Sequence, residues 1–300
     1  MLSIVCWLVH CVLLLLTVAF FTLFERKVIG LFHNRLGPNK VSFVGLVQPL
    51  LDAFKLLSKQ SIVPLRSNKF TYNFAPQSSL ILSLLIWLTI PRLYFMFSIN
   101  YSLVVFFCVG SVIVFSVLLA GWSSNSKYSL IGSLRSVAQS ISYESVFSTL
   151  VVLISLLLLS FSIRRSFMIS SLVFFPLLPF WLICTLAETH RAPFDFRESE
   201  SELVSGFNTE YSGAYFAFIF LSEYTVLLYS CILITFLFFS WLLPLTVFAV
   251  VILTLLFRFL FIWIRITFCR FRYDILIIFS WKILLPSILM LFVVYIPVFL

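Results

Sequence analysis

The sequence predicts an all-α integral membrane protein with about eight transmembrane helices in a single domain, residues 1–300. Of its 300 residues, 62% are hydrophobic and only 10% are charged, and the mean hydropathy is +1.15. Several apolar runs approach the length of about 20 residues that a helix needs to cross a hydrocarbon core. A membrane β-barrel would instead show segments of about ten residues in which polar and apolar side chains alternate.

Eight continuous apolar runs are the expected spans. They cover residues 4–24, 74–90, 103–121, 137–160, 167–186, 213–239, 243–263 and 281–300. The first run lacks a basic leader and a small-residue cleavage site, and it continues directly into Glu25, Arg26 and Lys27. It is therefore not a secretory signal, and we expect it to remain in the mature protein.

Lysine and arginine predict the orientation. With helix ends counted together with their loops, 17 of the 20 basic residues fall in the odd-numbered connections, and the exceptions are Arg92, Arg164 and Arg165. By the positive-inside rule both termini lie outside, and the connections 25–73, 187–212 and 264–280 lie inside. The same asymmetry accounts for the net charge of +9 better than nucleic-acid binding does.

The first inside connection contains a short amphipathic segment. One helical stripe carries Val47, Leu50, Leu51, Phe54 and Leu57, and the opposite face carries Gln48, Asp52, Lys55 and Lys59. At about thirteen residues it is too short to span a bilayer, so a helix in the membrane surface is predicted. It serves either as a membrane anchor or as part of a ligand entrance.

Two glutamates lie inside apolar runs. Glu144 is about seven residues into the fourth run, and Glu223 is about ten residues into the sixth. An ionised carboxylate at mid-membrane costs about 2.5–3.5 kcal/mol on insertion scales, which favours the protonated form. The two groups are therefore candidates for proton exchange. The alternative is a structural ion pair with an arginine such as Arg135 or Arg191.

The connection 187–212 concentrates acidic residues. It holds six of the eleven in the chain, namely Glu188, Asp195, Glu198, Glu200, Glu202 and Glu210. In an extended backbone, alternating glutamates project to one side, and their mutual repulsion raises their affinity for protons. A solvated loop is the simpler explanation, but it fits poorly with the phenylalanines in the same stretch, which indicate docking against the membrane domain or a partner.

Ligands for a redox cofactor or metal are missing from the sequence. The six cysteines are scattered without a CxxC motif, and the three histidines include no opposed pair within the spans. We therefore expect no metal site and no redox centre in this chain. Any electrons come from another subunit.

Four long stretches, residues 25–60, 121–144, 187–224 and 270–286, together resemble subunit one of respiratory complex I, the proton-translocating NADH:ubiquinone oxidoreductase. The resemblance implies an eight-helix subunit beneath the peripheral arm that forms much of the ubiquinone-binding chamber and the first part of an acidic path toward proton translocation. Ubiquinone is the implied substrate, and FMN and iron–sulfur clusters belong to partner subunits. The implied partners are the quinone-module subunits on the inside face, neighbouring membrane-arm subunits and lipid.

The resemblance also implies roles for individual residues. Those of the quinone chamber are Arg26, Arg35, Gln48, Asp52, Ala53, Lys55, Arg191, Asp195, Phe216 and Phe220. Those of the proton path are Glu144, Glu188, Glu223, Glu198, Glu200, Glu202 and Glu210. Those that support the structure are Arg270, Arg272, Asp274 and Lys282.

Several positions depart from the pattern of that family. They are His33, Gln60, Phe115, His190, Ser199, Cys269, Ile275 and Ile278.

The high phenylalanine content favours the mitochondrial inner membrane, with the bacterial plasma membrane as the alternative. The other functions to be considered are the corresponding subunit of a membrane-bound hydrogenase, a secondary transporter built from repeated halves, and a purely structural docking subunit.

Overall fold

The computed structural model describes residues 2–90, 100–163, 175–195, 206–239 and 247–299, and these ranges contain helices and no strands. The α-helices in chain order are α1 (Leu2–Phe32), α2 (Gln48–Ser58), α3 (Lys69–Ile86), α4 (Ser102–Ser123), α5 (Lys127–Leu158), α6 (Leu178–Glu188), α8 (Gly213–Phe238), α9 (Val247–Thr267), α10 (Tyr273–Phe279) and α11 (Leu285–Phe299). A π-helical turn, Ser280–Leu284, joins α10 to α11. The all-α prediction is confirmed.

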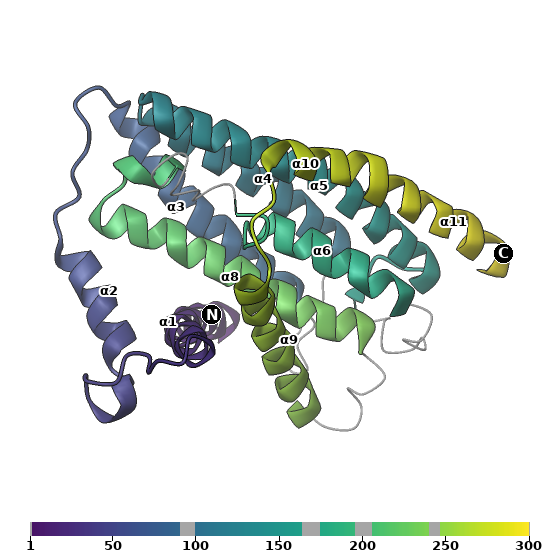
Figure 1. Cartoon of the computed structure of the whole chain (residues 1–300), viewed down its shortest axis with the longest axis horizontal. Helices are drawn as coiled ribbons and strands as arrows, with labels where there is room; N and C mark the ends of the chain where they lie inside the picture. The colour runs from purple at the N-terminus through teal and green to yellow at the C-terminus, as the bar shows by residue number, and fades with distance from the viewer. Residues whose placement is uncertain (1, 91–99, 164–174, 196–205, 240–246, 300) are drawn as a thin grey trace.

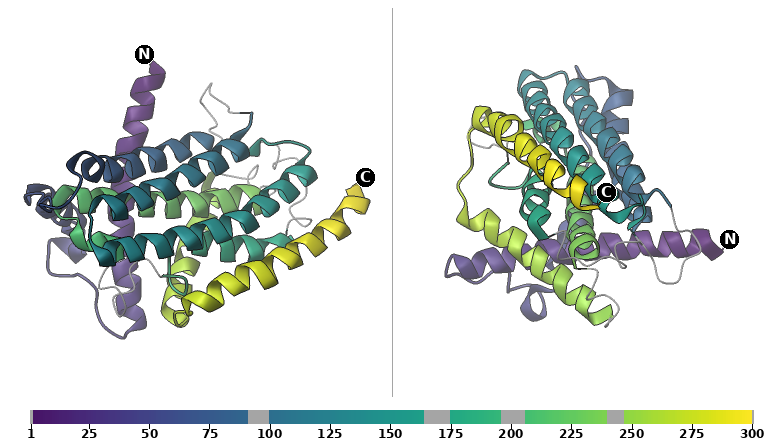
Figure 2. Two further views of the ribbon diagram at one scale, coloured as in Figure 1. Left: turned by 90° about the horizontal axis from the view of Figure 1, so that it is seen from above. Right: turned by 90° about the vertical axis from the view of Figure 1, so that its right-hand side faces the viewer.

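Most of the long helices lie side by side (Figure 1). Helix α3 packs against α4 and α8, α4 packs against α5, and α11 runs along α5. Helix α1 crosses this bundle at a steep angle (Figure 2) and contacts α2, α8 and α9. The surface helix α2 in turn packs against α8. Residues near the start of the chain are thereby brought beside residues about 200 positions later.

Over the residues that the structure describes, all eight predicted spans overlap a helix. Six segments are long and apolar enough to cross a membrane, namely Cys6–Phe32, Ser102–Ser123, Lys127–Leu158, Gly213–Phe238, Phe248–Thr267 and Tyr273–Tyr295. Helices α3 and α6 correspond to the other two runs, and residues 167–174 of the fifth run lie outside the described residues. The prediction of a multi-pass membrane protein is therefore confirmed.

Several helix boundaries differ from the predicted ones. Helix α1 continues to Phe32 instead of ending near residue 24, and α5 begins at Lys127, ten residues before the predicted start. Helices α9 and α10 occupy most of the predicted loop 264–280. The hydropathy of the sequence marks where the hydrocarbon core of the bilayer ends. A helix can continue beyond that point into a polar region, because its backbone hydrogen bonds are satisfied within the helix.

The predicted surface helix is confirmed as α2. Its apolar stripe, including Leu50, Leu51, Phe54 and Leu57, is exposed in the isolated chain, while Pro49 at its first turn is buried. An exposed apolar face on so short a helix fits a position in the membrane interface.

The core is centred on α5, α6 and α8. Trp181 on α6 is fully buried, with ring centroids 4.5 Å from Phe147 on α5 and 5.9 Å from Phe238 on α8. Helix α5 also closely approaches the segment before α8, because a Cβ added at Gly132 would lie 2.8 Å from the Cα of Gly206. This contact fixes the end of the acidic connection against the helix that carries Glu144.

Candidate functional site

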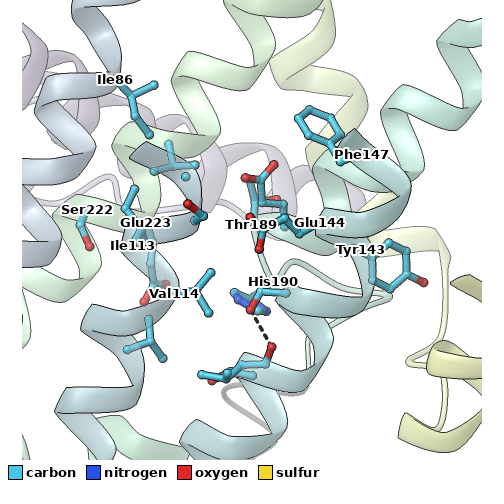
Figure 3. Close-up of a pocket in the computed structure, with 18 of the residues that line it drawn as sticks. Ile86, Ile113, Val114, Tyr143, Glu144, Phe147, Thr189, His190, Ser222 and Glu223 are labelled. Carbon is cyan, nitrogen blue, oxygen red and sulfur yellow. Dashed lines mark hydrogen bonds between the residues drawn. The ribbon is translucent and has the colours of Figure 1, made fainter. Parts of the chain in front are cut away.

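A cavity of about 80 Å³ lies between α4, α5, α8 and the end of α6. Three glutamates line it, each from a different helix: Glu144 on α5, Glu188 at the end of α6 and Glu223 on α8. Figure 3 shows Glu144 and Glu223 on the helices that bound this space. A buried water needs about 10–15 Å³ of such volume, so the cavity has room for several.

Serine hydroxyls provide acceptors in the cavity wall. Ser79, Ser140 and Ser222 line the cavity, and each donates its hydroxyl hydrogen to a carbonyl of its own helix at 2.7–2.9 Å. The oxygen of such a hydroxyl can still accept a hydrogen bond from water. The wall can therefore orient water molecules between the carboxyl groups.

Two of the three acidic side chains, Glu144 and Glu188, interact with each other. The Glu144 carboxyl lies close enough to Glu188 to act on it electrostatically. Glu188 also rests against α4, since a Cβ added at Gly110 would lie 3.5 Å from its Oε1 atom. Carboxyl groups that share a cavity titrate as a coupled set, so loss of a proton from one changes the proton affinity of the other.

His190 lines the cavity, although no role was predicted for it from the sequence. It follows α6 directly, lines the cavity beside Thr189, and is labelled with Glu144 in Figure 3. Its φ of 50° is in the left-handed region. Histidine is among the side chains that adopt this region more often than most, so this departure from the family pattern is compatible with the backbone.

A second group of charges surrounds Glu25, which is only 6% exposed. Its carboxylate accepts hydrogen bonds from Arg191 Nη1 at 3.1 Å, from Tyr224 Oη at 2.8 Å and from Arg265 Nη1. The Arg191 guanidinium also lies 4.3 Å from the centre of the Tyr224 ring. These contacts join α1, α8, α9 and the segment that follows α6.

The charge balance of this group is unusual, because one carboxylate holds two guanidinium groups. Burial alone would lower the pKa of Arg191, but Glu25 and Tyr224 outweigh that effect and raise the pKa above its ordinary value. Arg191 also lies within electrostatic range of Glu223. Arg191 therefore interacts both with Glu25 and with one of the carboxyl groups that line the cavity.

Sequence reasoning did not identify Glu25 as a site residue. As the alternative to proton exchange it named Arg135 or Arg191 as an ion-pair partner for Glu144 or Glu223, and the structure shows an ion pair of Arg191 with Glu25. An acidic residue at the charged end of the first apolar run, in a chain with so few acids, was the available signal.

The segment that carries Glu188 and Arg191 is fixed at both ends. Gln139 Nε2 on α5 donates to the Ala187 carbonyl at 3.0 Å and to the Phe194 carbonyl at 2.8 Å. The Phe194 ring stacks on Phe271 with a centroid distance of 5.8 Å. These contacts attach the segment after α6 to α5 on one side and to the connection between α9 and α10 on the other.

The predicted supporting residues occupy two environments. Arg270 lies 3.8 Å from Asp195 and adds an ion pair to the same connection. Arg272 and Asp274 pair with each other at 3.3 Å, and both are largely exposed, as is Lys282. Arg270 therefore has a direct contact with the acidic segment, and the roles of the other three stay predictions.

Part of the predicted quinone chamber comes together between α1 and α2. Asp52 accepts hydrogen bonds from Arg26 Nη1 at 2.8 Å and from Gln48 Nε2 at 2.9 Å. Phe216 and Phe220 pack against each other on α8, with ring centroids 4.4 Å apart. Other residues predicted for this region are exposed, namely Arg35, Ala53 and Lys55.

The remaining predicted acids are not part of the cavity wall that the structure describes. Glu198, Glu200 and Glu202 lie outside the described residues, as does Ser199. Glu210 lies in the 3-10 turn Gly206–Glu210, and its backbone carbonyl accepts a hydrogen bond from Tyr72 Oη at 2.6 Å. It is not among the residues that line the cavity. Its predicted place in a proton path is therefore without a contact to Glu144, Glu188 or Glu223.

Cysteines and histidines form no redox or metal centre over the described ranges. All six cysteines are free, and no group of three His, Cys, Asp or Glu side chains suitable for a metal ion occurs there. Fold and site thus define a multi-pass membrane protein with a carboxyl-lined cavity beside a buried ionic group.

Comparison with known proteins identifies the family. Residues 5–296 match the family described as NADH dehydrogenase. The chain is 47% identical over 292 residues to NADH-ubiquinone oxidoreductase chain 1 of Heterololigo bleekeri, covering 94% of this chain and 92% of that protein. The proteins of the same name from Aedes aegypti and Lemur catta are 46% and 44% identical, each over 93% of this chain and 90% and 91% of their own length.

The chain therefore belongs to the NADH dehydrogenase family and is a membrane subunit of NADH:ubiquinone oxidoreductase. Other subunits of that complex are its partners, and ubiquinone is the substrate of the complex. The family favours this assignment over a self-contained transporter or a hydrogenase subunit.

Proposed function

We propose that this subunit forms a wall of the ubiquinone chamber, and that Glu144, Glu188 and Glu223 form the first part of a proton path that leads from it. The observation that carries the proposal is that these three carboxyl groups, from three different helices, line one cavity. Carboxyl groups and water can pass protons along such a cavity, because each carboxyl group both donates and accepts a hydrogen bond when it is protonated.

The proposal gives Arg191 the task of coupling the chamber to the cavity. Reduction of a quinone to a quinol takes up electrons and protons, so the charge on nearby acidic groups changes during turnover. Arg191 is held by Glu25 and also senses Glu223. A change in charge on either side alters the field at the other, because little water screens a buried group.

The chamber wall is proposed to include the contact between α1 and α2 and the facing part of α8. The Arg26, Gln48 and Asp52 contacts hold the polar side of α2, while its apolar stripe meets the membrane. A hydrophobic quinone approaches most easily through such an interface. The protein is proposed to reside in the mitochondrial inner membrane, with the quinone-module subunits docked on the face that carries α2 and the acidic connection.

Replacing Glu144 by Gln in the assembled complex tests the proton path. The change preserves shape but removes the exchangeable proton, and loss of a proton-transfer group typically lowers rates about 10²-fold or more. NADH:quinone reductase activity and proton pumping, followed with a pH-sensitive dye in vesicles, should both fall while the subunit remains in the complex.

Asp274→Asn is the matched control, because Asp274 is exposed, does not line the cavity, and forms its ion pair with Arg272. It should retain both activities. A Glu144→Gln complex that reduces quinone and pumps protons at the unmodified rate would exclude Glu144 from the path.

A further inference from the structure

Arg258 lies in the middle of α9. It falls within the seventh predicted span, 243–263, although the count of basic residues grouped it with the connection that follows, and the structure places it well inside the helix. In the apolar segment Phe248–Thr267 it is ten residues from the start and nine from the end. At 1.5 Å per residue, it is about 14–15 Å from either end.

Helix α8, which packs beside α9, indicates the same position of Arg258 within the membrane segment. The side chain of Arg258 interacts electrostatically with Cys231 on α8. Cys231 lies seven residues after Tyr224, and Arg258 lies seven residues before Arg265, and both Tyr224 and Arg265 bind Glu25. Both helices therefore place Arg258 two turns, about 10 Å, from the Glu25 group.

The chain offers Arg258 little compensation for its charge. Its Nε atom is buried without a hydrogen-bond partner, and over the described residues Arg258 forms no hydrogen bond or ion pair. A neutral thiol such as that of Cys231 is a weak acceptor, whereas a guanidinium group has five donors. Glu25, which pairs with Arg265 two turns further along α9, already binds two arginines.

Arg258 lies at the edge of the buried side of α9. Thr254, Phe261 and Ile262, which share its side of the helix, are buried. On the adjoining side, Leu255 is 47% exposed and Phe259 is 40% exposed. A group from outside the chain can therefore reach the guanidinium along the seam between α8 and α9.

We propose that a transmembrane helix of a neighbouring subunit packs on the exposed face of α9 and pairs an aspartate or glutamate with Arg258. Apolar contacts with residues such as Leu255 and Phe259 supply the packing, and the ion pair fixes the register. A charged residue at this depth is costly unless it is paired within a protein assembly. A lipid phosphate is the less suitable partner, because phosphates lie beyond the ends of the apolar segment.

Modification of arginine with phenylglyoxal tests this interface, with labelling located by mass spectrometry. Arg258 should remain unlabelled in the intact complex and in the complex treated with phospholipase, and it should be labelled once the subunit is dissociated in mild detergent. Arg191 is the internal control, because its partner Glu25 belongs to the same chain, and it should stay protected throughout.

Three outcomes overturn the proposal. Labelling of Arg258 in the intact complex shows that nothing covers it, and protection in the dissociated subunit shows that its own chain covers it. Labelling after phospholipase treatment, with the subunits still attached, assigns the site to a lipid phosphate.

Variants provide an independent measurement on the assembled complex. Arg258→Leu should speed the loss of the neighbouring membrane subunit in a detergent titration at least tenfold, whereas Arg258→Lys should stay close to the unmodified complex because it keeps the charge. Equal retention in the Leu and unmodified complexes overturns the proposal. Equal loss of the neighbouring subunit from the Arg258→Leu and Arg258→Lys complexes also overturns it, because the positive charge would then not be what holds the neighbour.

Discussion

Replacing Glu25 by Gln removes the charge that holds Arg191 and Arg265 together, while it keeps the size of the side chain and one acceptor for Tyr224. The two guanidinium groups then lie close together without a counter-charge. Arg191 is 13% exposed and Arg265 is 33% exposed, so water can stabilise the second better than the first. Breaking a buried ion pair by removing one partner costs about 3–5 kcal/mol, and the lower half of that range is expected here because Arg265 is partly hydrated.

The assay is the unfolding of the full chain in mixed micelles as the fraction of denaturing detergent rises. A loss of about 3 kcal/mol lowers the ratio of folded to unfolded protein about 100-fold at 25 °C. Tyr224→Phe, which removes one hydrogen bond to the carboxylate, should cost about 1.5–3 kcal/mol.

The two changes share one carboxylate, so the double variant should cost less than the sum of the single variants. A Glu25→Gln cost below about 1 kcal/mol, the range of an exposed ion pair, would refute the idea that this group is a buried ionic centre. Additive costs in the double variant would refute the contact between Tyr224 and Glu25.

Three further changes test the surrounding framework. Gln139→Leu removes two hydrogen bonds to buried carbonyls and should cost about 2–4 kcal/mol, with faster amide exchange in the segment that it anchors; unchanged exchange would contradict the anchoring role. Gly132→Ala places a methyl group 2.8 Å from the Gly206 Cα atom and should cost about 1–3 kcal/mol in the same detergent titration, and a neutral result would show that the contact relaxes. Arg26→Ala breaks a largely exposed pair with Asp52 and should cost less than about 1 kcal/mol, an effect that added salt reduces further.

The helical class and the apolar segments could be predicted from the sequence because the bilayer imposes a simple rule on it. A segment that crosses the hydrocarbon core meets no water, so its backbone must form its hydrogen bonds within the segment and its side chains must be apolar over its length. The ends of α1 and α5 could not be predicted in this way, because the charged residues that end an apolar run are equally compatible with more helix.

Glu144 and Glu223 could be singled out because an acid inside an apolar run is costly wherever the helix packs. Glu25 was marked only by the scarcity of acids in the chain, and both Glu25 and His190 lie just beyond an apolar run, where charge and polarity are ordinary. Their importance depends on which distant residues they meet, and Arg191 and Arg265 lie 166 and 240 positions from Glu25 along the chain.

By itself, the sequence determined that this chain crosses a membrane many times, that it carries acids at a cost within its spans, and which family it resembles. Only the tertiary structure decided that Glu144, Glu188 and Glu223 share a cavity, that Glu25 holds Arg191, and that the Nε atom of Arg258 is buried without an acceptor within the described residues. The reason is physical. Burial depends on each segment's own composition, whereas a pairing of charges depends on how helices far apart in the chain pack together.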